Sequence, residues 1–503
     1  MKRLAACLIL VAAVSAAAYV NTLANGFVLD DLETVVDNKA IRDWRNLGLL
    51  VSPRYFRQFG EFSYRPLATF THFLDRGLWR LNPVGCHAVN VFLHALNAGL
   101  VSLVAFSMGR QVSAALAAGL IFSLHPVCSE VVNAVSFRED ALTLAFLLLA
   151  LLSYSRVFSG RSRGAGRRWY AISLLCHALS MLAKETGVLV LPLLVLRDLV
   201  GGALHRHARQ SCFSEGTLLS AVNSKSEIRS TKQIQMTETA MTETGERRRP
   251  MPKRKAMFWS LGFGVLDLFR ISCFGLRIWL RPRAALGSRG RLYLGYAALT
   301  AGYLFVRFHL FRNPMEAVAG KFAFHSLSGV CQIVAEYARL LLLPTNLTAH
   351  YVEPLPTGLA TFVSLVFAFG LLMAVTGARS RLGWFGLAWV LIALAPVAAV
   401  SPPTGHILAE RYAYVAAAGF CLGLSVIARP RGRMWPALVA CALLYAALVL
   451  GRNPAWKNAK GLSAQTVVTA PRSSTAWNNL ACDYLQRGEF KRAVVASQRA
   501  VAL

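Results

Sequence analysis

Two neighbouring carboxylates, Asp30 and Asp31, follow the first apolar stretch of the chain. Repulsion between carboxylates this close favours the protonated form of one of them. A carboxylate so placed can take a proton from an acceptor hydroxyl and thus act as a general base. A structural alternative stays open, because an Asp at this point can also cap a short helix.

Three further groups of charged residues lie beside apolar stretches: Arg138-Glu139-Asp140, Lys184-Glu185 and Glu410-Arg411. Charges in such places are costly and are usually kept for function. Every group contains both signs of charge, and convergence of both signs on one side of a membrane indicates a site that handles an anionic, lipid-linked substrate.

Each group also has a structural interpretation. The two acids of the first group suit a helix N-terminus, although Arg138 and the nearby His125 equally suit a substrate cradle. Lys184 and Glu185 either pair at a tight turn or leave the lysine as a phosphate contact. Arg411 adds positive charge to the positive end of a helix dipole, which favours binding of an anion such as phosphate.

A polar stripe follows the second apolar stretch, with His87, Asn90, His94 and Asn97 at intervals of three, four and three residues. This spacing places all four on one face of a helix. A polar stripe in a membrane helix points into the bundle. It either makes hydrogen bonds between helices or lines a substrate cavity.

The composition places these residues in a polytopic membrane protein. The chain has 503 residues, of which 55% are hydrophobic and 16% are charged, and its formal net charge is +30. The basic residues occur in short runs between apolar stretches, as expected for loops on the inner side of a membrane. We therefore predict anionic membrane lipids as partners and no nucleic acid, whose binding needs a basic face on a folded soluble domain.

Joining the basic runs predicts about eleven transmembrane helices in an all-α protein, with the N-terminus inside and the C-terminus outside. All four charged groups then face the outer side, and Lys184 to Gly187 form a turn there. Residues 326–344 are expected to form an interfacial or re-entrant helix, and the aromatic residues of the outer segment 24–87 to anchor it at the interface. The expected spans are 4–23, 88–107, 112–127, 139–155, 169–183, 187–200, 291–311, 359–376, 383–400, 412–428 and 435–452.

We predict four regions: a transmembrane half at 1–201, an inner insert at 202–257, a second transmembrane half at 258–452, and an outer tail at 453–503. The insert is polar and basic, which predicts disorder, and residues 258–280 suit an amphipathic helix on the inner leaflet. The ten cysteines include no CxxC pair and no metal-ligand spacing, so no metal site is predicted. The sequence contains no P-loop or HExxH motif, and no GxSxG elbow in a strand–helix setting.

The tail has the spacing of one tetratricopeptide repeat over residues 474–503, with Trp477 and Tyr484 at large-residue positions and Ser497 where an aromatic is expected. A single repeat cannot bury its own apolar face. The tail is therefore expected to form a helical hairpin that docks on the membrane domain or continues in further repeats.

Several stretches, in order, resemble the transmembrane and tetratricopeptide-repeat O-mannosyltransferases and their bacterial relatives, which are GT-C-type glycosyltransferases. The resemblance covers about 4–200 and 291–503. The family usually has a Gly where Phe137 stands. The matching stretches are the Asp pair, Ser63 to Leu67, Leu81 to Asn97, Leu124 to Val127, Leu182 to Glu185, Ala409 to Tyr412 and the repeat in the tail.

The resemblance implies a polyprenyl-phosphate sugar donor, such as dolichyl-phosphate mannose, and a Ser or Thr hydroxyl of a polypeptide as acceptor. It implies that Asp30 or Asp31 is the base, and that Arg411, helped by Lys184 or His406, holds the donor phosphate. The lipid carrier supplies an activated sugar, so the reaction requires no nucleotide, cofactor or metal. Further residues implied at the donor site are Arg138, Glu139, Asp140, Glu185, Glu410 and Tyr412, and the expected cavity lining is Arg65, His87, Asn90, His94 and His125.

Two other functions remain alternatives: a transporter of lipid-linked sugars and a non-catalytic membrane scaffold. A transporter is expected to distribute its charges through the depth of the bilayer, and a scaffold to tolerate loss of Asp30 and Asp31. The membrane is expected to be that of the endoplasmic reticulum in a eukaryote or the inner membrane in a bacterium.

Overall fold

The computed structural model describes residues 2–59, 63–158, 163–201, 282–311, 323–324, 326–351, 380–401, 408–427 and 435–503. These residues are almost entirely helical, and the predicted all-α class is confirmed. One short antiparallel pairing joins β1 (Ala323–Phe324) to β2 (Val400–Ser401). Residues 1–196 and 291–503 form one compact unit and residues 197–290 a second. The site described below lies within the first unit.

Five helices in the described ranges are long and apolar enough to cross a membrane, and a bent pair gives a sixth. The bend of 53° falls between α5 (Val112–Leu124) and the short helical stretch 126–133. Pro126 causes this break, because proline has no N–H and disfavours helical geometry at the preceding residue, here the extended His125. The five are Lys2–Ala24 (α1, Lys2–Tyr19, with η1, Val20–Ala24), α4 (Pro83–Gly109), α7 (Arg138–Val157), α14 (Arg381–Ala399) and Trp435–Lys457, which begins with α16 (Trp435–Arg452).

Other expected spans coincide with helices that are shorter or less apolar. The predicted span 359–376 lies outside the described residues, as do the insert 202–257 and the helix at 258–280. The count of eleven therefore stays a prediction. The shorter or less apolar helices that coincide with expected spans are α8 (Arg163–Ala183), residues 190–201, α11 (Pro282–Phe305) and η9 (Glu410–Ala413) with α15 (Tyr414–Leu424).

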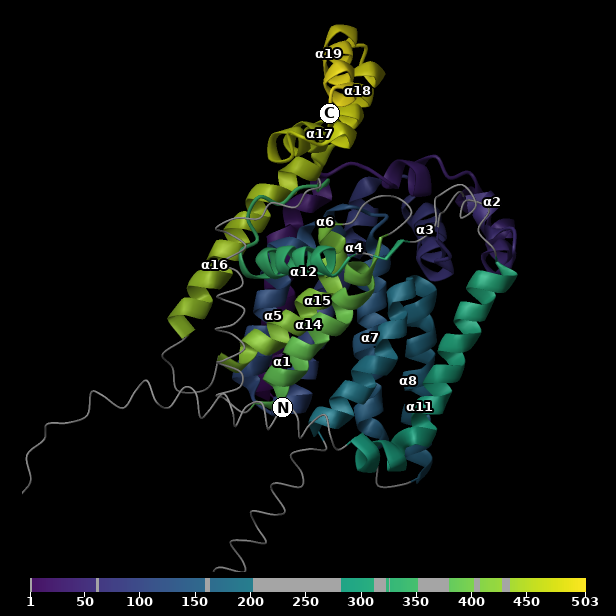
Figure 1. Ribbon diagram of the computed structural model, residues 1–503, viewed down its shortest axis with the longest axis vertical. Coiled ribbons are helices and arrows are strands. Elements are labelled where there is room, and N and C mark those ends of the chain that lie inside the picture. Colours follow the sequence, from purple (N-terminus) through teal and green to yellow (C-terminus); the bar gives the residue numbers. More distant parts are fainter. Residues whose placement is uncertain are drawn as a thin grey trace, which may run out of the picture. The chain divides into compact units, whose positions relative to one another are not determined.

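Close approach of backbones holds some of these helices together. A Cβ on Gly386 of α14 would lie 2.3 Å from the Gly423 backbone nitrogen and 2.5 Å from the Gly419 carbonyl oxygen of α15. Small residues that let backbones meet are typical of membrane helix contacts. Gly187 likewise lies against the end of α8, so the predicted break near Lys184 is a tight packing point. Figure 1 shows α7 and α8 side by side, and α12 (Leu327–Leu342), the expected helix at 326–344, crosswise to α14 and α15.

The outer segment after α1 folds into short helices around an aromatic cluster. Tyr55, Phe56, Phe59 and Tyr64 are buried there with Phe73, whereas the outlying Trp44 and Trp79 are exposed. The expectation that this segment's aromatics serve as interfacial anchors is thus wrong for the four clustered ones, which form a core of their own. The short helices are η2 (Leu32–Val36), η3 (Ala40–Arg42), η4 (Trp44–Val51), α2 (Tyr55–Phe59) and α3 (Pro66–Trp79).

The tail continues from α16 through η11 (Asn453–Lys457) and α17 (Ala459–Thr469) into the hairpin of α18 (Ser474–Gln486) and α19 (Phe490–Val501), as Figure 1 shows. Gly488 turns the hairpin with a φ of 75°, which favours glycine. Ser473 caps α18 by accepting from the Ala476 N–H. The predicted helical hairpin is confirmed.

Candidate active site

A cluster of five charged side chains, which we call the acid–lysine cluster, lies at the N-terminus of α7. Arg65, just before α3, lies 2.5 Å from Glu139 and 3.5 Å from Glu185. The Lys184 Nζ lies 3.1 Å from Glu139 and 2.6 Å from Asp140. The structure thus brings together residues from three segments that were chosen separately from the sequence.

Charge compensation opposes burial at two members of this cluster, Glu185 and Lys184, whereas burial raises the pKa of Asp140 to about 6. Burial raises the pKa of Glu185, but Arg65, Arg307 and Lys184 lower it more, so the net shift is downward. Burial lowers the pKa of Lys184, while Asp140 and Glu139 raise it to a net value above the ordinary one. Lys184 is therefore a cation already held by two carboxylates, and a phosphate would have to compete with them.

Arg138 points away from this cluster and is completely buried. Its guanidinium lies 2.6 Å from Asp75 and donates to Asn90 at 2.7 Å and to the Cys86 carbonyl at 2.9 Å. The N–H groups of the Arg138 guanidinium thus already have partners within the protein. The structure gives Arg138 the role of a tie between α3, α4 and α7, where the sequence suggested a wall of the sugar pocket.

The two neighbouring aspartates have different environments. Asp31 is fully buried and accepts from the Ser136 N–H at 2.7 Å and the Val28 N–H at 3.2 Å. Burial raises its pKa to about 6, although these hydrogen bonds oppose the shift. Burial, rather than repulsion from its neighbour, is the cause. Asp30, by contrast, is exposed. Of the two roles weighed from the sequence, Asp31 thus takes the structural one by anchoring the loop, and the accessible Asp30 remains the candidate base.

Arg411 lies at the start of η9 and is held by Glu130. Glu130 accepts from the Arg411 backbone N–H at 2.8 Å and from Nη1 at 2.7 Å. The guanidinium carbon lies 4.3 Å from the centre of the Phe137 ring and 5.1 Å from that of Tyr412, within the range of cation–π attraction. The departure at Phe137 thus provides one face of the Arg411 site.

The electrostatic surroundings connect Arg411 to Asp30. Burial lowers the pKa of Arg411, but the charges of Glu130, Tyr412 and Asp30 raise it to a net value above the ordinary one. The side chain is still 17% exposed. The Lys184 Nζ also lies 5.6 Å from the centre of the Tyr412 ring, so this one ring lies near both cations.

Glu410 has different partners from Arg411. Both of its oxygens accept from Arg452, at 2.8 and 2.9 Å, and one accepts from the Tyr351 hydroxyl at 3.2 Å. Glu410 is completely buried, and burial raises its pKa while Arg452 opposes the shift. This pair is structural, and it fixes the turn from which Arg411 projects.

The polar stripe of α4 is buried and hydrogen-bonded to the protein. His94 contacts the Tyr414 hydroxyl at 3.0 Å, and Asn97 donates to the same hydroxyl at 3.2 Å. Asn90 donates to the Ala134 carbonyl at 2.8 Å, and His87 lies 3.2 Å from the Gly26 carbonyl. Of the two alternatives, the geometry favours contacts between segments over a cavity lining.

His125 does not join the cradle expected with Arg138. It is fully buried, its Nε2 lies 2.9 Å from the Leu341 carbonyl, and it accepts from the Val127 N–H. His406 lies outside the described residues. Within the ranges that the structure describes, no group of three His, Cys, Asp or Glu side chains could hold a metal ion.

Sequence reasoning missed the partners of the key cations. Glu130 and Asp75 were not singled out, although Glu130 is an acid in an otherwise apolar stretch and could have been flagged for that reason. Arg452 and Asn453, at the end of α16, were also missed. Nothing in their local sequence points to the site.

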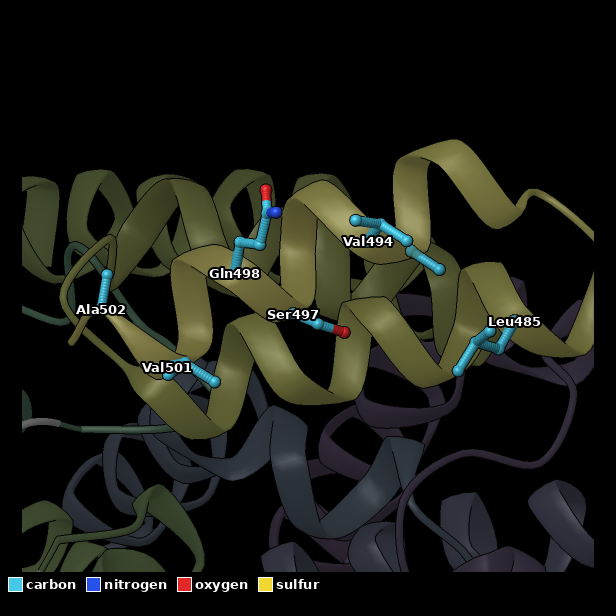
Figure 2. Close-up of a pocket in the computed structure, with 7 residues that line it drawn as sticks. Leu485, Val494, Ser497, Gln498, Val501 and Ala502 are labelled. Carbon is cyan, nitrogen blue, oxygen red and sulfur yellow. The ribbon is translucent and has the colours of Figure 1, made fainter.

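A separate groove lies on the tail. It has a volume of about 450 Å³ and lies along α18 and α19, as Figure 2 shows. None of its lining residues belongs to the charged clusters. They are Leu485, Ala493, Val494, Ser497, Gln498, Val501 and Ala502.

Comparison with known proteins identifies one relative along nearly the whole chain and others along little more than a third of it. Tmtc3 of Drosophila melanogaster, a protein O-mannosyl-transferase, is 25% identical over 542 residues, covering 96% of this chain and 54% of that protein. Mouse TMTC2, also so named, is 32% identical over 200 residues, covering 37% of this chain and 23% of its own. Human TMTC4, also named a protein O-mannosyl-transferase, is 30% identical over 217 residues, covering 38% of this chain and 29% of that protein. The chain thus spans about half or less of the curated relatives it matches.

No family model and no solved structure matches the chain. The resemblance drawn from the sequence is nevertheless confirmed, because homologous curated proteins carry the name of that family. The apolar helices agree with a multi-pass membrane protein.

Proposed function

We propose that this chain, a homologue of the transmembrane and tetratricopeptide-repeat protein O-mannosyl-transferases, is a membrane glycosyltransferase. It moves a sugar from a polyprenyl-phosphate donor to a Ser or Thr hydroxyl of a polypeptide. The names of its relatives support mannose as the sugar and protein as the acceptor. The reaction takes place at the outer or luminal face of the membrane.

One observation carries the proposal: the loop of the exposed Asp30 is hydrogen-bonded at Ser136, directly before the Phe137 ring on which the partly exposed Arg411 guanidinium stacks. Asp30 is exposed and its charge acts on Arg411, which projects from a distant part of the chain. Proton removal and stabilisation of a leaving phosphate are the two tasks that sugar transfer from a lipid phosphate requires.

The chemistry then follows from these two groups. The acceptor oxygen attacks the anomeric carbon, and its proton passes to the Asp30 carboxylate. The bond from that carbon to the phosphate oxygen breaks, and Arg411 stabilises the negative charge left on the lipid phosphate. Attack from the face opposite the phosphate inverts the configuration of the sugar. Asp31 supports Asp30 by fixing its loop to Ser136.

The acid–lysine cluster borders the same region through Tyr412, whose ring contacts both Arg411 and Lys184. We assign Glu139, Asp140 and Glu185 to recognition of sugar hydroxyls, since carboxyl groups are strong acceptors. The membrane is the endoplasmic reticulum of a eukaryote or the inner membrane of a bacterium.

The test is transfer of labelled mannose from polyprenyl-phosphate mannose to Ser- and Thr-containing peptides by the purified protein, read by mass. Asp30→Asn should abolish transfer while membrane insertion persists. Asp37→Asn, which removes another exposed acid from the same outer segment, should leave transfer unchanged. Full activity of Asp30→Asn would exclude Asp30 as the base, and a wild-type protein that transfers no sugar would favour the scaffold or transporter.

A further inference from the structure

The last apolar helix ends in two consecutive residues that reach in different directions. Arg452 is the last residue of α16, and Asn453 is the first of η11. Arg452 pairs with Glu410, next to Arg411, while Asn453 contacts the segment that precedes Asp30. Both halves of the proposed site are thus connected to one short turn.

Asn453 is completely buried in a group of four asparagines. Its Nδ2 donates to Asn21 at 2.7 Å, and its Oδ1 accepts from Asn133 at 2.9 Å. Asn25 donates to Asn133 at 2.9 Å and to the Asn453 carbonyl at 3.1 Å. A buried polar network that is satisfied in this way fixes a single arrangement, because each lost bond leaves a buried polar group without a partner.

This network fixes the loop that carries the aspartates. Asn25 and Gly26 begin the loop, and the Gly26 N–H donates to the Lys457 carbonyl of η11 at 2.9 Å. A Cβ on Gly26 would lie only 3.3 Å from that carbonyl oxygen. The loop is therefore held against η11 at its start and against Ser136 at Asp31.

The same turn fixes the phosphate-binding side. Arg452 contacts both oxygens of Glu410, and the neighbouring residue in the chain is Arg411. In addition, the fully buried Trp456 of η11 packs in one cluster with Val28 and Phe137. Phe137 is the ring on which Arg411 stacks.

We propose that Arg452 and Asn453 are positioning residues that set the placement of the Asp30 carboxylate relative to the Arg411 guanidinium. The proposal rests on the proposed function, because it concerns the same two groups. Asn453 acts through Asn25 and the aspartate loop, and Arg452 acts through Glu410 and η9. Neither residue touches the reacting atoms.

The two residues should have separable effects on the kinetics. Asn453→Ala displaces the base, so kcat should fall about 100-fold, as for a misplacement of about 1 Å, with the KM for polyprenyl-phosphate mannose within about twofold of wild type. Arg452→Met combined with Glu410→Gln avoids an unpaired buried charge. It shifts Arg411, so the KM for the donor should rise at least about tenfold. Arg452→Lys alone keeps the positive charge beside Glu410, so its donor KM should rise less than that of the double variant.

Ser473→Ala is the matched control, because it removes a buried cap in the same tail that contacts neither half of the site. It should leave both kinetic constants unchanged. Activity losses of equal size in Ser473→Ala and Asn453→Ala would overturn the proposal, as would a kcat for Asn453→Ala within about twofold of wild type.

Hydrogen–deuterium exchange gives a readout that does not require activity. Asn453→Ala should speed exchange in residues 25–37, and the Arg452/Glu410 double variant in residues 408–413, with the helices of the bundle unchanged. Faster exchange throughout the bundle, or none in these segments, would overturn the proposal. If the wild-type protein transfers no sugar, the proposed function fails, and exchange alone decides whether the turn positions the two segments.

Discussion

Glu130 holds Arg411 at two points, accepting from its backbone N–H at 2.8 Å and from its guanidinium at 2.7 Å. Glu130 is 1% exposed and Arg411 17% exposed. The carboxylate thus sets both the start of η9 and the direction of the cation, and leaves the other side of the guanidinium towards Phe137 and Tyr412.

Replacing Glu130 by Gln should therefore weaken both the fold and donor use. Breaking a buried ion pair from one side typically costs about 3–5 kcal/mol, so the thermal midpoint in detergent should fall. In protein that remains folded, kcat/KM for the donor should fall at least about tenfold, or about 1.4 kcal/mol. Glu33→Gln, on the exposed surface of the outer segment, is the control. An unchanged midpoint with full activity would contradict this role of Glu130.

Phe137 should contribute to donor affinity through its ring. Phe137→Leu keeps an apolar side chain at this buried position but loses the cation–π contact, which is worth about 0.5–2 kcal/mol. The KM for polyprenyl-phosphate mannose should rise by about 2- to 30-fold, with little change in the thermal midpoint. Equal donor KM values for the wild-type protein and Phe137→Leu would show that the Phe137 ring contributes to packing alone.

Asp31 should make stability depend on pH. Its pKa is raised from 3.8 to about 6, so between these values the folded protein keeps a proton that the unfolded chain loses. Stability should therefore decrease as pH rises from about 4 to about 6, by at most about 3 kcal/mol. Asp31→Asn cannot titrate, so this part of the slope should disappear. The check is to measure the thermal midpoints of the wild-type protein and of Asp31→Asn from about pH 4 to about pH 7. Identical slopes of midpoint against pH in the two proteins would refute this role of Asp31.

Arg138 should prove structural. Asp75→Asn leaves the buried guanidinium without its carboxylate and should cost about 3–5 kcal/mol of stability. Because neither residue faces the site, donor KM should stay the same in the protein that folds. The thermal midpoint and the donor KM of Asp75→Asn should both be measured on one preparation and compared with the wild-type values. A raised KM at an unchanged midpoint would return Arg138 to the sugar pocket.

Much of the fold and part of the site could be predicted from the sequence. Apolar length and basic loops placed α1, α4, α7, α14 and α16, and Gly187 marked the break after α8. The convergence of Glu139, Asp140 and Lys184 followed from the topology alone, since adjoining ends of neighbouring helices share one side of the membrane.

The partners of the cations could not be predicted in the same way. Glu130 and Arg411 are separated by 281 residues, and Arg138 and Asp75 meet only because α3 packs beside α7. Spacing along one helix carries no information on such pairs. The opposite environments of Asp30 and Asp31 depend on Ser136, another distant residue. For the same reason spacing alone does not distinguish the clustered aromatics of the outer segment from interfacial anchors.

The glycine contact between α14 and α15 restricts how the proposed lipid-borne donor would be accommodated. At Gly386 even a single added carbon would collide with the backbone of the neighbouring helix, 2.3 Å away. An isoprenoid chain is far wider than this seam, so it cannot thread between these two helices at that depth. The lipid tail of the proposed donor would therefore leave towards the lipids by another side of the bundle.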